Sequence, residues 1–296
     1  MRERAQHFDP RQNMHNSDFE IFHYREPKPN EVEVHHHDFY EVYFFLNGEV
    51  EYWVEGRIFR LLPGDLLLIN PMELHRPIVK TNSPVYERIV LWIDKEYLKA
   101  FTNNSADLMR CFDSTSPTHT NLLRPAPGDR ADITTHLGDL VRESYSAEFG
   151  ANLAAQGLFL QFMVKLNRLA ASLALASDTA GVLVDKNLKK EHPETSPLIA
   201  RVLSYINEHY GEPLSLDDLS QRFFVSKYHL SHEFSKAVGT GLYRYITLKR
   251  LLIAKQMLSE GLPPGEVYGK CGFKDYTNFF RAFKAEYGIS PSACMQ

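Results

Sequence analysis

The sequence predicts an α+β protein of two domains, with a β-rich N-terminal domain carrying flanking helices and an all-α C-terminal domain. The length of 296 residues fits two domains of ordinary size. Short runs rich in Val, Ile, Tyr and Phe fill residues 18–94, whereas the last hundred residues show helical periodicity and an internal repeat. With 44% hydrophobic and 24% charged residues, the composition excludes a disordered or fibrous chain.

The net charge of −4 is an average over two different regions. Residues 1–197 contain 21 Lys and Arg against 28 Asp and Glu, which gives −7, whereas residues 198–296 contain 12 against 9, which gives +3. Such an asymmetry indicates a nucleic-acid or membrane module at the positive end.

The cysteines and the N-terminus predict a reduced cytoplasmic protein. Cys111, Cys271 and Cys294 lie far apart and form no CxxC pair, so a disulfide framework is not expected. The N-terminal arm, residues 1–17, lacks the apolar core of a secretory signal. The longest apolar stretch, near Gly157–Val164, is shorter than the roughly 18–20 residues of a membrane span. We therefore expect no membrane contact.

The β-rich region, residues 18–94, reads as short strands separated by turns. Asn47-Gly48 is a hairpin signal, because both residues tolerate a positive φ. Many short strands at this spacing predict a sandwich or a barrel. The clearest predicted strands are Phe19–Tyr24, Phe39–Leu46, Val50–Val54, Arg57–Leu62 and Val85–Ile93.

Helical patterning follows in residues 95–176, most strongly between Ala131 and Leu175. Helices beside a small β domain either cover it or form a dimer contact, and both interpretations stay open at this point. Residues 177–196 mix Asp, Lys, Glu, Thr and Pro and are predicted to be a linker. The remaining residues, 197–296, form the all-α domain.

This C-terminal domain repeats itself with a shift of 49 residues. Each copy predicts a short helix, a tight turn and a second, capped helix, which is the outline of a helix-turn-helix unit. The matched positions are an N-cap residue (Ser226 and Asp275), two apolar residues (Leu230 with Phe234, and Phe279 with Phe283) and a terminating glycine (Gly239 and Gly288).

A long helix between the two copies, over Gly241–Leu258, has apolar residues nearly all round. Such a helix must be packed on more than one side, so we expect it to join the two units. Its length of roughly 27 Å is close to the 34 Å repeat of the DNA major groove.

The second helix of each copy presents polar residues opposite its buried pair. Steps of 100° expose Tyr228, His232 and Ser235 in the first copy, and Thr277, Arg281 and Lys284 in the second. Side chains of these types read base edges in the major groove. Cations on the same domain suit phosphate contacts: Lys227, Lys236, Arg244, Lys249, Lys274 and Lys284.

Four segments of this domain resemble the signature of the AraC-type transcription regulators, over residues 197–292. They are Arg250 to Ala254, Gly272-Phe273, Phe279-x-x-x-Phe283-Lys284 and Gly288 to Pro291. The resemblance implies two helix-turn-helix units joined by a long helix. Carried over by motif, it assigns base reading to Tyr228, Ser231, His232, Tyr276, Thr277, Asn278 and Arg281.

The β-rich region resembles a cupin barrel over residues 18–94. His35-x-His37-x3-Glu41-x6-Gly48 is similar to the first cupin motif, and Gly64-Asp65 with Asn70-Pro71-x3-His75 to the second. In metal-binding cupins the positions of His35, His37, Glu41 and His75 are ligands; in related regulators such groups bind a small effector. We assign effector binding to these four residues and Tyr43, with Tyr40, Tyr52 and Trp53 as further rings, and leave metal binding open.

These observations predict an effector-responsive, sequence-specific transcription regulator that controls carbohydrate or related metabolic genes. The expected partners are double-stranded operator DNA, a small molecule such as a sugar, a second copy of the chain through the 131–175 helices and, for an activator, RNA polymerase. No catalytic residue and no cofactor are assigned. The alternative is a metal-dependent cupin enzyme of the isomerase or dioxygenase type.

Overall fold

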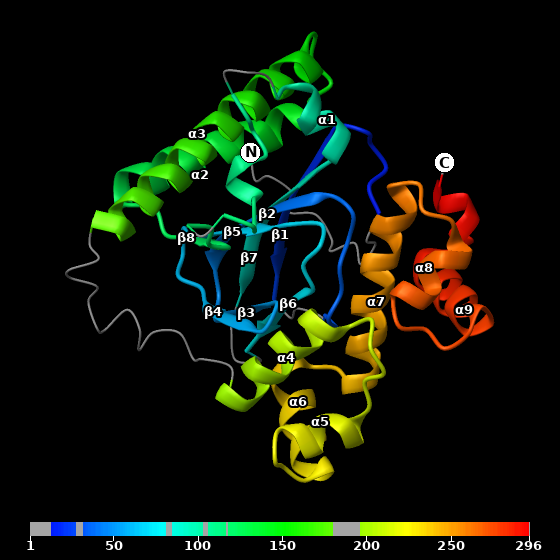
Figure 1. Ribbon diagram of the computed structural model, residues 1–296. Coiled ribbons are helices and arrows are strands. Elements are labelled where there is room, and N and C mark those ends of the chain that lie inside the picture. The colour runs from blue at the N-terminus through cyan, green and yellow to red at the C-terminus, as the bar shows by residue number, and fades with distance from the viewer. Residues whose placement is uncertain are drawn as a thin grey trace. The chain divides into compact units, whose positions relative to one another are not determined.

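The computed structural model describes residues 13–27, 32–80, 85–102, 106–116, 118–179 and 196–295 (Figure 1). Most of the expected N-terminal arm and linker lies outside the described residues. The chain divides into two compact units near residue 193, one holding the β-rich part and its helices, the other the C-terminal helices. Each unit is described separately.

The N-terminal unit contains two antiparallel sheets. The larger has the order β1-β7-β2-β5-β8 and the smaller the order β4-β3-β6. The strands of the larger sheet are β1 (Phe19–Glu26), β7 (Tyr86–Ile93), β2 (Tyr40–Asn47), β5 (Leu66–Ile69) and β8 (Leu122–Leu123). Those of the smaller are β4 (Arg57–Arg60), β3 (Val50–Val54) and β6 (His75–Val79).

The larger sheet is buried on both faces, and its residues alternate between two apolar clusters. In β2, Val42 and Phe44 belong to the cluster under the helices, whereas Tyr43 and Phe45 belong to the cluster between the sheets. Tyr52 of β3 contributes to the second cluster from the smaller sheet. The unit is therefore a stack of helices, sheet and sheet.

Helices α2 (Pro127–Ser144) and α3 (Ala151–Thr179) form a hairpin over one face of the larger sheet (Figure 1). Phe159 and Phe162 of α3 are fully buried there, and Phe159 stacks on Phe19 with ring centroids 4.5 Å apart. By length and composition alone, the Ala151–Leu175 window could cross a membrane, with a mean hydropathy of 1.3. Of that window, 22% is buried within the structure, where it packs against α2 and the sheet.

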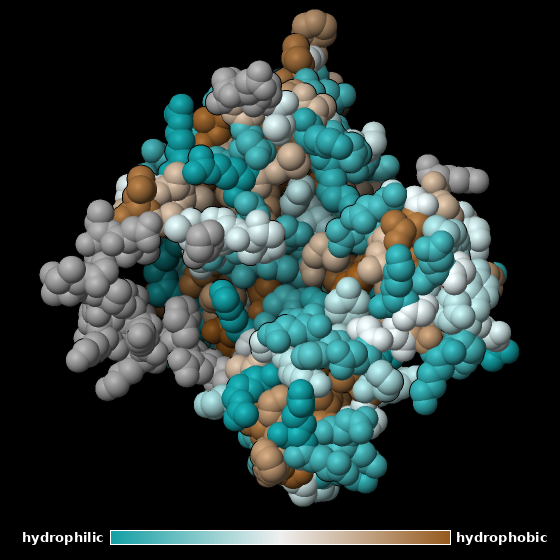
Figure 2. All heavy atoms as spheres, viewed as in Figure 1, coloured by the Kyte–Doolittle hydropathy of each residue, from teal (hydrophilic) through white to brown (hydrophobic). Residues whose placement is uncertain are grey.

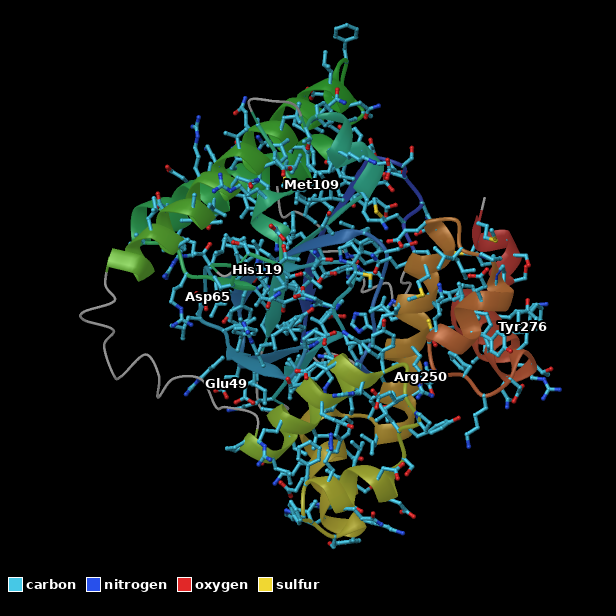
Figure 3. All side chains as sticks on the ribbon, viewed as in Figure 1. Glu49, Asp65, Met109, His119, Arg250 and Tyr276 are labelled. Carbon is cyan, nitrogen blue, oxygen red and sulfur yellow. The ribbon has the colours of Figure 1, made fainter. Side chains whose placement is uncertain are left out.

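The region 95–176 holds more than helices. It begins with α1 (Lys95–Ala100) and the short helix η1 (Arg110–Phe112), and it also supplies β8, which pairs with β5. Like β8, strands β5 and β6 lie outside the runs that the sequence pattern predicts. At the start of β5, buried Asp65 accepts hydrogen bonds from Arg124 Nε and Nη2, each 3.0 Å long (Figure 3). This ion pair ties the turn before β5 to the segment that follows β8.

The C-terminal unit is all helical, as predicted. The repeat is confirmed: Ser226 and Asp275 cap their helices by accepting from the backbone N–H groups of His229 and Asn278. Gly239 and Gly288 end the same helices in the left-handed region, with φ of 85° and 72°. The helices are α4 (Pro197–His209), α5 (Leu216–Arg222), α6 (Lys227–Val238), α7 (Leu242–Ser259), α8 (Pro264–Lys270) and α9 (Tyr276–Tyr287), followed by η3 (Pro291–Met295).

Helix α7 joins the two helix-turn-helix units. Near its start Tyr245 packs on Phe234 of α6, with ring centroids 5.5 Å apart, and further along Leu251 and Leu258 share one cluster with Phe279 and Phe283 of α9. The second helix of each unit, α6 or α9, therefore packs on the same long helix, α7.

Arg250, in the middle of α7, fastens the loop between α4 and α5 (Figure 3). Its Nε donates to the carbonyl of Tyr210 at 2.8 Å, and its Nη2 to that of Glu212 at 2.7 Å. Gly272, after α8, lies against the same carbonyl and guanidinium with a φ of +78°. Glycine is required here for two reasons. Other residues are strained at this φ, and a Cβ would clash with the Tyr210 carbonyl and the Arg250 guanidinium.

Candidate functional site

The recognition face of the first unit lies on α6. Tyr228 and His232 are exposed one turn apart, with ring centroids 6.1 Å apart, whereas Ser231 is half-buried. Lys227 is exposed and pairs with Asp217 of α5, with 2.5 Å between Nζ and Oδ1. This face offers an aromatic ring, an imidazole and a cation to a groove.

The corresponding face of the second unit lies on α9, where Tyr276, Thr277, Asn278 and Arg281 are all exposed (Tyr276 is labelled in Figure 3). The side-chain amide of Asn278 donates to the capping carboxylate of Asp275 at 2.6 Å. The cap thus orients Asn278, while the exposed Arg281 has the fork of donors that matches guanine O6 and N7.

The predicted phosphate-binding cations differ in exposure. Lys236, Lys274 and Lys284 are exposed, and so is Arg244, which pairs with Glu286 of α9 at 2.8 Å. Lys249 is half-buried. The four exposed lysines, Lys227 beside Asp217 and also Lys236, Lys274 and Lys284, are therefore better placed for phosphate contacts than Lys249.

A second polar site lies inside the N-terminal unit, where the structure gathers most of the predicted effector residues. Glu41 of β2 is its centre: its carboxylate accepts from Trp92 Nε1 at 2.9 Å and from the Tyr52 hydroxyl at 3.4 Å, and lies 3.3 Å from His37 Nε2. His75 of β6 lies beside His37, with ring centroids 4.8 Å apart. Acidic, imidazole and phenol groups are thus collected in an aromatic surrounding.

The three histidines of this site are held in the same way. Nδ1 of His35, His37 and His75 lies 2.8–2.9 Å from a backbone carbonyl, that of Glu33, Phe39 and Glu73 respectively. A carbonyl only accepts, so Nδ1 carries the proton in each ring. In the neutral His75 ring Nε2 is then an acceptor.

Burial and neighbouring charges shape the ionisation of this site. Burial beside two other imidazoles holds the pKa of His75 well below its usual 6.5, so the ring is neutral at pH 7. Burial opposes ionisation of Glu41, but the hydrogen bond and charge of His37, with further help from His35 and Trp92, outweigh it and lower its pKa. Burial, followed by the charge of Glu41, raises the pKa of Tyr52 well above 10.

Some of the expected residues lie elsewhere. Tyr43 is in the same layer, but its hydroxyl pairs with that of Tyr86, not with the histidines. Tyr40 faces the opposite side of β2 and stacks on Phe112 at 4.5 Å, so its expected place among the effector rings is wrong. Trp53 is one position out of step with Tyr52 on β3 and therefore points to the other face of its strand.

Two residues of the site were not predicted. Trp92 donates to Glu41 across the β2–β7 pair, where the two residues are in register. Arg88 lies over the Tyr86 ring at 4.0 Å and pairs with Glu26 at 2.7 Å, next to the Tyr43 hydroxyl pair. Strand register brings both to the site.

Comparison with known proteins identifies both units. Residues 16–163 match the model of the AraC-like ligand binding domain, and residues 219–296 match that of a helix-turn-helix domain. The chain belongs to the AraC family of transcription regulators. It has an N-terminal ligand-binding domain and a C-terminal DNA-binding domain.

Several relatives span most of the chain. The uncharacterised regulator YbfI of Bacillus subtilis (strain 168) is 26% identical over 246 residues, 82% of this chain and 80% of that protein. The transcriptional activator RhaR of Enterobacter sp. (strain 638) is 24% identical over 258 residues, 87% of this chain and 84% of that protein. Among solved structures, the DNA-binding domain of AdpA in complex with a target DNA is 26% identical, covers 33% of this chain and 89% of that chain, and has a TM-score of 0.32.

Membership of this family confirms the predicted regulator of transcription and the two-domain α+β fold. Because AraC-family proteins are regulators and not enzymes, the interpretation of the chain as a metal-dependent cupin enzyme is set aside.

Proposed function

We propose that this AraC-family protein reads its operator with both recognition helices and adjusts its occupancy of DNA when a small molecule binds the N-terminal unit. The main support for this proposal is the pair of capped helices, α6 and α9, that pack on α7 and present exposed polar residues. Base contacts fall to Tyr228, Ser231, His232, Tyr276, Thr277, Asn278 and Arg281.

The length of α7 supports simultaneous reading of two groove segments. Its 18 residues span roughly 27 Å at 1.5 Å per residue. Major-groove segments on one side of B-DNA repeat every 34–36 Å. A rod of this length suits two recognition helices in successive turns, with phosphate contacts from Lys227, Lys236, Arg244, Lys249, Lys274 and Lys284.

The proposed effector site is the polar cluster around Glu41. His35, His37, Glu41, Tyr43 and His75 supply hydrogen-bonding groups within an aromatic layer. Sugars and related polyols combine hydroxyl groups with apolar ring faces, so they match such a lining. This match supports a carbohydrate or a related metabolite as the effector, and genes of its metabolism as targets.

The chain is proposed to act as a homodimer through α3. Leu153 and Leu175 are 73% and 65% exposed, and Gly157 and Ala171 are also exposed on this side of the helix. Figure 2 shows apolar side chains at the surface at both ends of the α2–α3 hairpin. Leu153, Gly157, Ala171 and Leu175 are 4, 14 and 4 positions apart, so at about 100° per residue they lie in one stripe on one side of the helix.

Activation is the proposed outcome of DNA binding. RhaR and RhaS, which align with 87% of this chain, are both named transcriptional activators. An activator at a promoter needs a contact with RNA polymerase, so the polymerase is a further proposed partner.

Substitution of Arg281 tests base reading. After selection of bound sites from random DNA, with and without candidate sugars, Arg281→Ala should cost about 1–3 kcal/mol at one cognate base pair and relax the preference there. Fluorescence anisotropy against the selected site and its single-base variants measures this.

Lys284→Ala, on the same helix, is the matched control. A lost phosphate contact weakens binding to every sequence alike and reduces the salt dependence by about one phosphate. Uniform weakening by Arg281→Ala would contradict its assignment as a base-reading residue.

A further inference from the structure

Phe224, in the turn between α5 and α6, has a backbone conformation that most side chains avoid. Its φ is +55°, in the left-handed region. A Cβ in this region lies close to the following carbonyl oxygen, so residues other than glycine, asparagine and aspartate rarely adopt it. A bulky aromatic residue at this position therefore strains the turn.

The matching turn of the second unit contains the residue that this geometry favours. In both turns the second residue after the first helix donates its backbone N–H to a carbonyl three residues earlier. Phe224 donates to Gln221 at 3.2 Å, and Gly272 donates to Gly269 at 3.0 Å. The φ of Gly272 is +78°. The first unit thus has phenylalanine at the position where the second unit has glycine.

The packing of the first unit does not account for this phenylalanine. Phe224 is 95% exposed. The residue before it, Phe223, is half-buried instead, and the Arg201 guanidinium lies 5.4 Å from the centre of its ring. Phe224 therefore buries almost no apolar area that would offset the strain of its backbone. Backbone strain of this kind clusters at functional sites.

The place of Phe224 in the chain points to DNA. It lies two residues before Ser226, the N-cap of α6. When a helix-turn-helix unit docks, its first helix crosses the DNA backbone, and the N-terminal residues of its second helix contact base edges in the major groove. The turn that joins the two helices therefore lies beside the groove. Exposed Lys227 and Tyr228 follow at the start of α6 and continue the same surface.

The chemistry of the side chain limits what it can contact there. A phenyl ring carries no hydrogen-bond donor or acceptor for a phosphate or a polar base edge. The apolar group that the major groove presents is the 5-methyl group of thymine, and phenylalanine is among the side chains that contact it. We propose that Phe224 packs against a thymine methyl at the edge of the groove segment that α6 reads, and so adds a base preference to the first unit. This inference rests on the proposed function, because it requires α6 to bind DNA.

The test removes the methyl group and the ring separately. Fluorescence anisotropy measures binding of the full-length protein to the selected operator and to duplexes in which one thymine at a time is replaced by deoxyuridine. Burying one methyl group is worth roughly fourfold in affinity, so the wild type should lose about that factor at one position. Phe224→Gly should bind the unmodified operator at least about fourfold more weakly, and deoxyuridine at that position should weaken its binding no further.

Phe224→Leu is the matched control, because it keeps an apolar side chain and the left-handed strain at the same position. It should retain a preference for thymine over deoxyuridine there. Phe224→Gly should unfold at the same urea concentration as wild type or at a higher one, since glycine relieves the strain. A lower unfolding midpoint would make Phe224 a structural residue and would overturn the proposal.

Equal losses from deoxyuridine in wild type and Phe224→Gly also overturn it. Normal operator binding by Phe224→Gly with lost activation of transcription in vitro does the same, and would place the ring against RNA polymerase. Sequence-specific binding by the wild type without this coupling to a thymine methyl leaves the proposed function intact. A wild type without any sequence preference overturns both.

Discussion

Gly272 is a position of the C-terminal unit at which the structure requires glycine. A Cβ there would lie 2.7 Å from the Tyr210 carbonyl oxygen and 2.9 Å from the Arg250 guanidinium, at a φ of +78°. We expect Gly272→Ala to lower the free energy of unfolding by about 1–3 kcal/mol. The alanine strains the left-handed backbone, and its Cβ disturbs the hydrogen bond between Arg250 and the Tyr210 carbonyl. Urea unfolding followed by helical circular dichroism measures it.

Gly269, three residues earlier in α8, provides the control. Nothing lies within 4 Å of a Cβ at this position. Gly269→Ala should therefore stabilise the unit by about 0.4–1 kcal/mol, because alanine loses less entropy than glycine in a helix. If both variants behaved alike, the close approach of Gly272 to Tyr210 would not be what the position requires.

His75 gives the N-terminal unit a defined pH dependence. Its folded pKa lies well below 6.5 because it is buried near His35 and His37. As the pH falls below about 6.5, the unfolded chain takes up a proton that the folded unit does not, so acid lowers the free energy of unfolding. The loss from this residue is about 1.4 kcal/mol per pH unit until the folded pKa is reached.

The measurement is urea unfolding at about pH 7.5 and about pH 5.5, since these values lie on either side of the usual histidine pKa. Both tryptophans of the chain, Trp53 and Trp92, lie in the N-terminal unit, so their fluorescence reports it. His75→Asn should show a smaller loss of stability on acidification than wild type. An unchanged loss would contradict a neutral, buried His75.

At the scale of elements, the sequence predicts best where the signal is local. The caps, core pairs and terminal glycines of α6 and α9 follow from residues within one or two turns. Strand β5 was missed because Leu66–Ile69 is buried on both faces and shows no alternation. Tyr40 was misplaced because the face of β2 depends on which neighbour each side meets.

The cap of α9 couples helix stability to base reading. Asp275 accepts from the backbone N–H of Asn278 and from its side-chain amide. We expect Asp275→Ala to cost about 0.5–2 kcal/mol of stability. It should also weaken DNA binding at the base pair that Asn278 contacts, because the amide is no longer held.

The comparison with Ser226→Ala separates the two effects. Ser226 caps α6 through the backbone of His229. Its loss should cost similar stability without changing the base preference of the second unit. Thermal unfolding and anisotropy titrations against single-base variants of the operator test both statements.

For the whole molecule, the candidate site shows what sequence leaves open. The resemblance to the cupin motifs implies a shared site for His35, His37, Glu41 and His75, and the structure brings His37, Glu41 and His75 together. Trp92 could not be found this way, because it is 51 residues from Glu41 and meets it only through the register of β2 and β7. The partners of a buried polar group depend on pairing across the sheet, which no local pattern encodes.

The modest positive charge of the C-terminal unit predicts that tight binding needs two chains. A net charge of +3 over residues 198–296 provides few phosphate contacts, and the slope of log K against log salt is about −0.9 for each contact.

If α3 forms the dimer, replacing exposed Leu153 and Leu175 by Asp places like charges in the interface. The double variant should be monomeric by light scattering, and its salt slope should be about half that of wild type. Thr135→Asp, at an exposed position of α2, adds a charge off this stripe and should leave the dimer and the slope unchanged. A double variant that stays dimeric would show that the chains associate through another surface.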